Sequence, residues 1–199
     1  SGAMHDQFGR SATDLRVSLT DRCNLRCTFC DKLPLLSRDQ LGDMDFDLYR
    51  KIIDEGEERQ LWSVKLSYRG EPLLNPAILE HIQLARQHWY DSELMLVTNG
   101  FFLHRFPELP KILAETECQL EISQHGTHQD YLERFRDVKA IVWSWRKQYP
   151  KLRINIRKSH KGWMRQYNVI DGKPMPFNSK PDAAYRVCMQ RTCTQLVNG

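Results

Sequence analysis

Five short segments of the chain have the alternating or continuous apolar pattern of β-strands, and segments with helical spacing of apolar residues lie between them. Residues 94–97 are apolar throughout, which is typical of a parallel strand buried on both faces. The predicted strands cover residues 15–19, 62–66, 94–97, 119–123 and 152–156.

Signals for helix starts support the four predicted helices, which end near residues 60, 89, 115 and 149. Asp45 and Asp47 are N-cap candidates for the first helix, and Asn75 followed by Pro76 marks the start of the second. The third and fourth helices begin near residues 108 and 129.

Strands and helices alternate at intervals of roughly thirty residues, which predicts an α/β fold with a parallel sheet. A full eight-unit barrel takes roughly 250 residues, so a chain of 199 residues favours a partial (βα)6 TIM-like barrel. The sixth strand is expected near residues 167–170. We expect a tag remnant and N-terminal extension over residues 1–13, the barrel domain over 14–170 and a loop-rich tail over 171–199.

Charge and hydropathy narrow the class of protein. The net charge is +4 and no run of like charges reads as a nucleic-acid arm, so no specific nucleic acid is expected as a partner. No stretch approaches the roughly 18 apolar residues of a membrane-spanning helix, and the polar opening is not a signal peptide. These features predict a cytoplasmic protein without a membrane partner.

Cysteine spacing is the strongest chemical signal. Three of the six cysteines, Cys23, Cys27 and Cys30, form a C-x3-C-x2-C pattern directly after the first predicted strand. In a reducing compartment such a cluster favours metal ligation. Three thiolates can bind three irons of a four-iron cluster and leave the fourth iron open to another ligand. A zinc site with a distant fourth ligand such as His125, an electron-transfer ferredoxin and unrelated buried thiols remain alternatives.

This motif, with aromatic Phe29 before its last cysteine, resembles the signature of the radical S-adenosylmethionine (radical SAM) enzymes. Gly70-Glu71-Pro72 is similar to that family's Gly-Gly-Glu-Pro segment, whose backbone meets the SAM amino group, although Arg69 replaces the first glycine. The resemblance implies a radical SAM partial barrel with a [4Fe-4S] cluster on the three cysteines. It implies SAM-binding residues at Phe29, Gly70, Glu71, Pro72, Asn99, Ser123 and Arg157.

The resemblance also implies a mechanism. The reduced cluster passes one electron to the SAM sulfonium, and the resulting 5′-deoxyadenosyl radical abstracts hydrogen from a substrate. The electron would come from a donor such as flavodoxin or ferredoxin. For Ser123, a ribose or carboxylate contact and a role as a barrel-lining residue both stay open. Arg157 is expected either to meet the SAM carboxylate or to be solvated.

Two further segments indicate which branch of the family is involved. Residues 8–10 and 14–24 resemble the GTP 3′,8-cyclases of molybdenum-cofactor biosynthesis. Cys188 and Cys193 resemble the start of an auxiliary-cluster segment of the SPASM or twitch kind, which implies a second iron–sulfur cluster, with two structural thiols as the alternative.

The main function hypothesis is therefore hydrogen abstraction from a peptide, sugar or other small polar substrate, leading to epimerisation, oxidation or cross-linking. A GTP 3′,8-cyclase-like enzyme is one alternative, and a non-catalytic iron–sulfur electron-transfer or sensor protein is another. Cys118 is either a core residue or a radical-quenching thiol. His125 and His128 follow the fourth strand, where they are acid–base candidates or solvent-facing loop residues.

Overall fold

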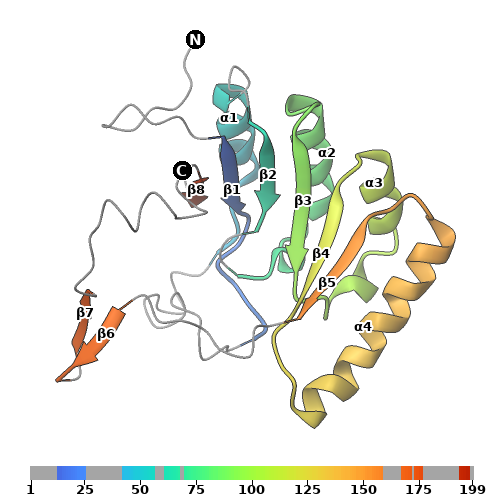
Figure 1. Ribbon diagram of the computed structural model, residues 1–199. Coiled ribbons are helices and arrows are strands. Elements are labelled where there is room, and N and C mark those ends of the chain that lie inside the picture. The colour runs from blue at the N-terminus through green and yellow to red at the C-terminus, as the bar shows by residue number, and fades with distance from the viewer. Residues whose placement is uncertain are drawn as a thin grey trace.

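The computed structural model in Figure 1 describes residues 13–25, 42–56, 61–67, 70–158, 167–171, 173–176 and 193–197. Its main feature is a six-stranded parallel sheet in the order β5-β4-β3-β2-β1-β8. The strands are β1 (Asp14–Ser18), β2 (Ser63–Leu66), β3 (Glu93–Thr98), β4 (Gln119–Gln124), β5 (Ile154–Lys158) and β8 (Cys193–Val197). The five predicted strands are all present, with ends that differ by at most two residues.

Helices cover one face of this sheet (Figure 1). They are α1 (Phe46–Gly56), α2 (Ile78–His88), α3 (Leu109–Glu115) and α4 (Gln129–Gln148), with 3-10 turns η2 (Pro72–Leu74) and η3 (Leu103–Arg105). Alternate strand residues are fully buried against these helices, including Val17, Val64, Leu96 and Ile122. Apolar residues at every second position of these strands therefore mark the face of the sheet that the helices cover.

Two predicted helix starts can be compared with the structure. Asp45 caps α1, because its Oδ1 accepts hydrogen bonds from the Asp47 and Leu48 amides at 2.9 and 3.1 Å. The prediction that α2 begins at Pro76 is wrong by two residues, because the helix starts at Ile78. Asn75 Oδ1 accepts a hydrogen bond from the Ala77 amide at 2.9 Å, before the first helical residue. The preceding turn η2 occupies the chain up to Asn75.

The opposite face of the sheet carries polar side chains. The residues that alternate with the buried ones on β1, β2 and β4 are partly exposed, and they include Arg16, Lys65, Gln119 and Glu121. Register places Arg16 beside Lys65 on neighbouring strands. An open sheet with helices on one side and polar residues on the other is the arrangement of a partial barrel, so the predicted α/β fold class is confirmed.

The predicted sixth strand exists but does not join the parallel sheet. Strand β6 (Tyr167–Ile170) pairs with β7 (Lys173–Pro176) as a separate antiparallel hairpin. Only Asp171-Gly172 separates the two strands, and a two-residue link of this composition joins antiparallel neighbours, whereas parallel strands need a long crossover. Asp171 has a φ of 51°, in the left-handed region that such a turn requires.

The expected loop-rich tail contributes two strands, β7 and β8, and β8 pairs in parallel with β1 at the sheet edge farthest from β5. The sixth strand of the sheet therefore comes from residues 193–197 rather than 167–170. The division of the chain into domains stays a prediction. Among the helices that the structure describes, none combines the length and apolar character needed to cross a membrane.

Candidate active site at the carboxyl edge of the sheet

The first cysteine lies just beyond the carboxyl end of β1. Cys23 is partly exposed, and its Sγ accepts a hydrogen bond from the Leu25 amide at 3.5 Å. Amide donors of this kind tune the thiolate ligands of iron–sulfur clusters. Cys27, Cys30 and Phe29 lie outside the described residues.

The two ends of the segment that contains the cysteines are joined by backbone contacts. Thr20 and Asp43 form an antiparallel bridge. On either side of it, the Asp21 amide donates to the Gly42 carbonyl and the Met44 amide donates to the Leu19 carbonyl, both at 2.9 Å. We call residues 19–25 together with 42–44 the neck of the cysteine loop. The neck fixes where the loop leaves and re-enters the fold.

Gly70 packs directly against the neck. Its φ is 64°, and a Cβ at this position would lie 2.4 Å from the Thr20 carbonyl oxygen and 2.5 Å from the Arg22 carbonyl oxygen. Both distances are far below van der Waals contact, so only glycine fits here. The next amide, Glu71 N–H, donates to the Arg22 carbonyl at 2.8 Å. The Gly-Glu-Pro segment and the neck are therefore neighbours in space.

The Glu71 side chain ties this segment to the end of β3. Its carboxylate is buried and accepts hydrogen bonds from Thr98 Oγ1 at 2.5 Å, the Asn99 amide at 2.8 Å and the Leu73 amide at 3.1 Å. Burial raises the pKa of Glu71 to about 7, and the three donors offset part of that rise. Pro72 begins η2 and is buried beneath the same segment.

Asn99 connects the end of β3 to the residue that follows Cys23. Its Nδ2 donates to Asn24 Oδ1 at 2.7 Å, and its Oδ1 accepts from the Phe101 amide at 3.1 Å. Four predicted site residues, Cys23, Gly70, Glu71 and Asn99, thus belong to one connected set of contacts.

Strands β4 and β5 bring a second set of predicted residues to the same edge. Ser123 is buried and stands in register with Arg157. Arg157 is 56% exposed, and its Nε lies 3.2 Å from Glu121 Oε1. The cation predicted to meet a SAM carboxylate therefore has a carboxylate partner in the chain itself, on the open face of the sheet.

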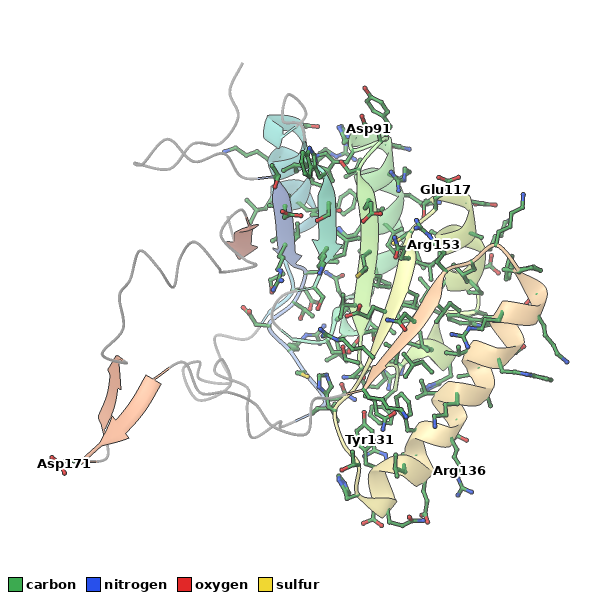
Figure 2. The ribbon with its side chains drawn as sticks, in the orientation of Figure 1. Asp91, Glu117, Tyr131, Arg136, Arg153 and Asp171 are labelled. Atoms are coloured by element: carbon green, nitrogen blue, oxygen red, sulfur yellow. The ribbon has the colours of Figure 1, made fainter. Side chains whose placement is uncertain are left out.

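The two histidine candidates also follow β4 at this edge. Figure 2 shows Tyr131 beyond the carboxyl ends of the strands, and its hydroxyl accepts a hydrogen bond from the His125 amide at 2.9 Å. Burial, helped by the nearby positive charge of Arg157, lowers the pKa of His125 and favours its neutral form. His128 is the N-cap residue of α4, with its ring 5.8 Å from that of Tyr131.

Cys118 and Cys193 lie at the other edge of the sheet. Cys118 directly precedes β4, next to Glu117, which Figure 2 places at the amino ends of the strands. It is buried, and burial raises the pKa of its thiol to about 12, so the thiol stays protonated. Cys193 begins β8 in register with Asp14, the first residue of β1. Neither cysteine is brought to Cys23, and Cys188 lies outside the described residues.

Among the described residues, Cys23 is the member of the C-x3-C-x2-C motif whose surroundings can be examined. Within the described part of the chain, no group of three His, Cys, Asp or Glu side chains is placed to hold a metal ion. In particular, no histidine or carboxylate there joins Cys23 in such a group. That Cys27 and Cys30 join Cys23 as ligands stays a prediction from the sequence, and a set of three thiolates would fit an iron–sulfur cluster because thiolates are the ligands that such clusters use.

Sequence reasoning missed five residues that shape this edge. They are Arg22, Asn24, Asp43, Thr98 and Glu121. Asn24 and Arg22 flank Cys23, and Thr98 precedes Asn99 at the end of a buried strand, so position alone could have singled them out. Asp43 and Glu121 carry no such signal, because their partners come from other segments.

Comparisons with known proteins bear on the family and the fold. The model of the Radical SAM superfamily matches residues 17–148. GTP 3′,8-cyclases are similar in sequence: that of Campylobacter jejuni is 37% identical over 110 residues (51% of this chain, 32% of that protein). That of Mycobacterium marinum is 43% identical over 102 residues (50% and 28%). A probable GTP 3′,8-cyclase of Thermococcus kodakarensis is 30% identical over 141 residues (69% and 43%). The chain thus spans less than half the length of these relatives.

Two solved structures share the fold. BtrN in complex with AdoMet and 2-DOIA has a TM-score of 0.58 at 19% identity, covering 75% of this chain and 57% of its own. The second, anSMEcpe with bound AdoMet and Cp18Cys peptide, has a TM-score of 0.54 at 21% identity, and the match covers 72% of this chain and 42% of anSMEcpe. At this level of identity the likeness is one of fold.

Proposed function

Because the chain belongs to the radical SAM superfamily, we propose that it cleaves SAM reductively at a [4Fe-4S] cluster held by Cys23, Cys27 and Cys30. Members of this superfamily are enzymes that use these two cofactors, so the predicted enzyme class and cofactors agree with the family. The observation that carries the proposal is the contact of Gly70 and Glu71 with the backbone around Arg22. It holds the segment expected to meet SAM beside the loop expected to hold the cluster.

When bound, the cluster and SAM supply a 5′-deoxyadenosyl radical that abstracts hydrogen from the substrate. The residues of the chain bind and orient these groups. Three thiols hold the cluster, and the backbone at Gly70 and Glu71 receives the SAM amino group. The Glu71 side chain supports this backbone and does not contact SAM itself, because its carboxylate already accepts hydrogen bonds from Thr98, Asn99 and Leu73.

The remaining proposed SAM contacts are Phe29, Pro72, Asn99, Ser123 and Arg157. Of these, Ser123 and Arg157 stand side by side in register at the carboxyl edge. Arg157 already pairs with Glu121, so a SAM carboxylate would share or replace that partner. His125, whose pKa is lowered by burial and by the positive charge of Arg157, is the proposed acid–base residue.

A polar substrate is favoured by the open face of the sheet. The side chains of this face include Lys65, Glu121 and Arg157. A cavity of about 470 Å³ beside the first residues of β4 and β5, lined by Gln119, Leu120 and Arg153 among others, lies toward the amino ends of the strands and is not part of the carboxyl edge. Side chains that donate and accept hydrogen bonds suit a peptide, a sugar or another small polar molecule. BtrN and anSMEcpe, which share the fold, bind 2-DOIA and a peptide respectively.

A GTP 3′,8-cyclase-like reaction is the second candidate. It is favoured by the 37–43% identity to such enzymes over about half of this chain. Incubation of the loaded protein with GTP, SAM and reductant tests it, because only a cyclase consumes GTP in proportion to the 5′-deoxyadenosine formed. A flavodoxin or ferredoxin is the proposed electron donor for either reaction.

The main test is anaerobic reconstitution with iron and sulfide. We expect about four irons and four sulfides per chain, an EPR signal of the reduced cluster that changes on addition of SAM, and 5′-deoxyadenosine when dithionite and SAM are both present. Cys23→Ala should abolish all three results, whereas Cys118→Ala, which removes a thiol at the opposite edge, should retain them.

Two other outcomes would refute the proposal, and a third would extend it. A cluster that forms but neither responds to SAM nor yields 5′-deoxyadenosine would indicate an electron-transfer or sensor protein. A colourless protein that retains zinc would indicate a structural metal site. Iron well above four per chain, lost in a Cys188→Ala/Cys193→Ala variant, would support the second cluster, which would then lie toward the amino edge of the sheet, where Cys193 begins β8.

A further inference from the structure

Arg22 joins three segments of the chain through its side chain. The guanidinium donates through Nε to Asp43 Oδ1 at 3.1 Å and through Nη2 to Asp43 Oδ2 at 2.6 Å. The same Nη2 donates to the Leu74 carbonyl at 2.8 Å. One planar group therefore connects the outgoing limb of the neck, its returning limb and the end of the turn η2 that follows Gly70 and Glu71.

The backbone of Arg22 is equally engaged. Its amide donates to Thr20 Oγ1 at 3.1 Å, and its carbonyl accepts the Glu71 amide at 2.8 Å. Cys23 is the next residue. Any change in the position of Arg22 is thus passed on to the first thiol and to the hydrogen bond with Glu71.

The ion pair is too exposed to matter much for global stability. The side chains of Arg22 and Asp43 are 44% and 29% exposed, and exposed pairs contribute little to the free energy of unfolding. Its geometry is nevertheless specific, because a guanidinium that bonds both oxygens of a carboxylate fixes direction as well as distance. A contact of this kind is better suited to placing the loop than to stabilising the fold.

We propose that Arg22 is a positioning residue that locks the neck of the cysteine loop onto the Gly70–Glu71 segment. The inference rests on the proposed function, because it concerns the distance between the first cluster ligand and the segment expected to meet the SAM amino group. Asp43 and the Leu74 carbonyl are the two partners through which Arg22 acts.

The first test uses the protein without cluster or SAM. Arg22→Met keeps the unbranched stem of the side chain and removes the guanidinium with its donors. Hydrogen exchange at the Met44 and Glu71 amides should accelerate by about tenfold or more, because both hydrogen bonds span the segments that Arg22 joins. Exchange at Leu96 and Ile122, in the core of the sheet, should be unchanged. Unchanged exchange at Glu71 would overturn the proposal.

The second test uses the reconstituted protein. Iron content in Arg22→Met should stay near that of the wild type, because all three thiols remain. The SAM concentration that half-saturates the change in the EPR signal should rise by about tenfold, equivalent to about 1.4 kcal/mol of binding free energy. Arg22→Lys should be intermediate, since a lysine ammonium makes a point contact and not a fork.

Asp43→Asn separates positioning from direct binding of SAM by Arg22. If Arg22 acts through Asp43, this variant weakens the SAM response in the same direction as Arg22→Met but by less, because the hydrogen bond to the Leu74 carbonyl remains. The double variant is then no worse than Arg22→Met alone. A normal response in Asp43→Asn together with a weakened one in Arg22→Met would refute the proposal in favour of a direct contact.

Arg86→Met is the matched control. Arg86 also joins separate segments, through hydrogen bonds to the carbonyls of Thr116, Trp89, Tyr90 and Ser92, but at the opposite edge of the sheet. It should lower the melting temperature and leave the SAM response unchanged. A wild-type protein that shows no SAM response would refute the proposed function, whereas a responsive wild type matched by Arg22→Met in both tests would refute only this inference.

Discussion

At the scale of single residues, Glu71 shows how one side chain can hold a site together without facing its ligand. Its carboxylate collects donors from the end of β3 and from its own turn, so the Gly70–Glu71 backbone is held in place from behind. The cost is a buried carboxyl group whose charged form is disfavoured.

Glu71 predicts a pH dependence of stability. Its pKa is about 7 in the folded protein and near 4.5 in the unfolded chain, so the folded state binds the extra proton between these values. Protonated Glu71 therefore contributes its full share to the free energy of unfolding below pH 4.5. This share is lost as pH rises through 7, and the loss is on the order of 3 kcal/mol. Urea unfolding from pH 4.5 to 8 should show a flatter profile for Glu71→Gln. Parallel profiles for the two proteins would contradict this account.

His81 is a second buried titratable residue, on α2. Asn75 Oδ1 accepts from the Ala77 amide, so its Nδ2 is a donor, and it lies 2.9 Å from the Leu19 carbonyl and 3.2 Å from His81 Nε2. The imidazole must then accept through Nε2 and carry its proton on Nδ1, which has no partner among the described residues. A charged His81 would also carry a proton on Nε2, which would then face the donor Nδ2 of Asn75.

His81 predicts the opposite pH dependence to that of Glu71. Burial lowers the pKa of His81 to about 4, against the opposing effects of Glu80 and Asp43. The unfolded state binds the proton more readily than the folded state. The contribution of neutral His81 to the free energy of unfolding is therefore full above pH 6.5 and is lost as pH falls toward 4, by on the order of 2–3 kcal/mol. The stability difference between the wild type and His81→Leu, measured by urea unfolding, should shrink over that range. A constant difference would show that His81 does not titrate there.

At the scale of elements, the arrangement of the site depends on the carboxyl ends of neighbouring parallel strands. β1 leads to Cys23, β2 to Gly70 and β3 to Asn99, and the order β3-β2-β1 brings these three ends together. Parallel sheets collect their functional loops at this edge. The sequence order of the motifs is therefore also their spatial order.

The edge strand β8 supports β1 from its other side, and proline substitutions test this. Successive N–H groups in a strand point to opposite sides, so one of Thr194→Pro and Gln195→Pro removes a hydrogen bond to β1 and the other does not. We expect the proline variant that loses a hydrogen bond to β1 to have a free energy of unfolding lower by about 0.5–1.5 kcal/mol, or a melting temperature lower by about 2–4 °C. Equal melting temperatures for both variants and the wild type would argue against the pairing.

At the scale of the whole molecule, the sheet separates two environments. Helices bury the apolar residues of one face, and the other face keeps Arg16, Lys65, Glu121 and Arg157 partly or well exposed. Cys23 lies at the carboxyl edge of the sheet, whereas Cys118 is buried at the amino edge. The fold thus provides a polar surface on the side of the sheet opposite to the helices.

The amino-acid sequence alone determined the parts of this protein that depend on nearby residues. The alternation of apolar residues predicted the five strands, and the C-x3-C-x2-C pattern after the first of them predicted the cluster loop. The Asp171-Gly172 turn was also readable, but the strand before it was assigned to the parallel sheet, because local periodicity does not specify a strand's partner.

Tertiary structure alone decided the contacts between distant segments. Arg22 meets Asp43 across 21 positions, Glu71 meets Thr98 across 27, and Asn24 meets Asn99 across 75. The placement of β8 beside β1 is of the same kind. Such pairs depend on strand order, register and the path of each loop, which arise only when the whole chain buries its core. For this reason the sequence located the cysteines, whereas the structure located the residues that hold them in place.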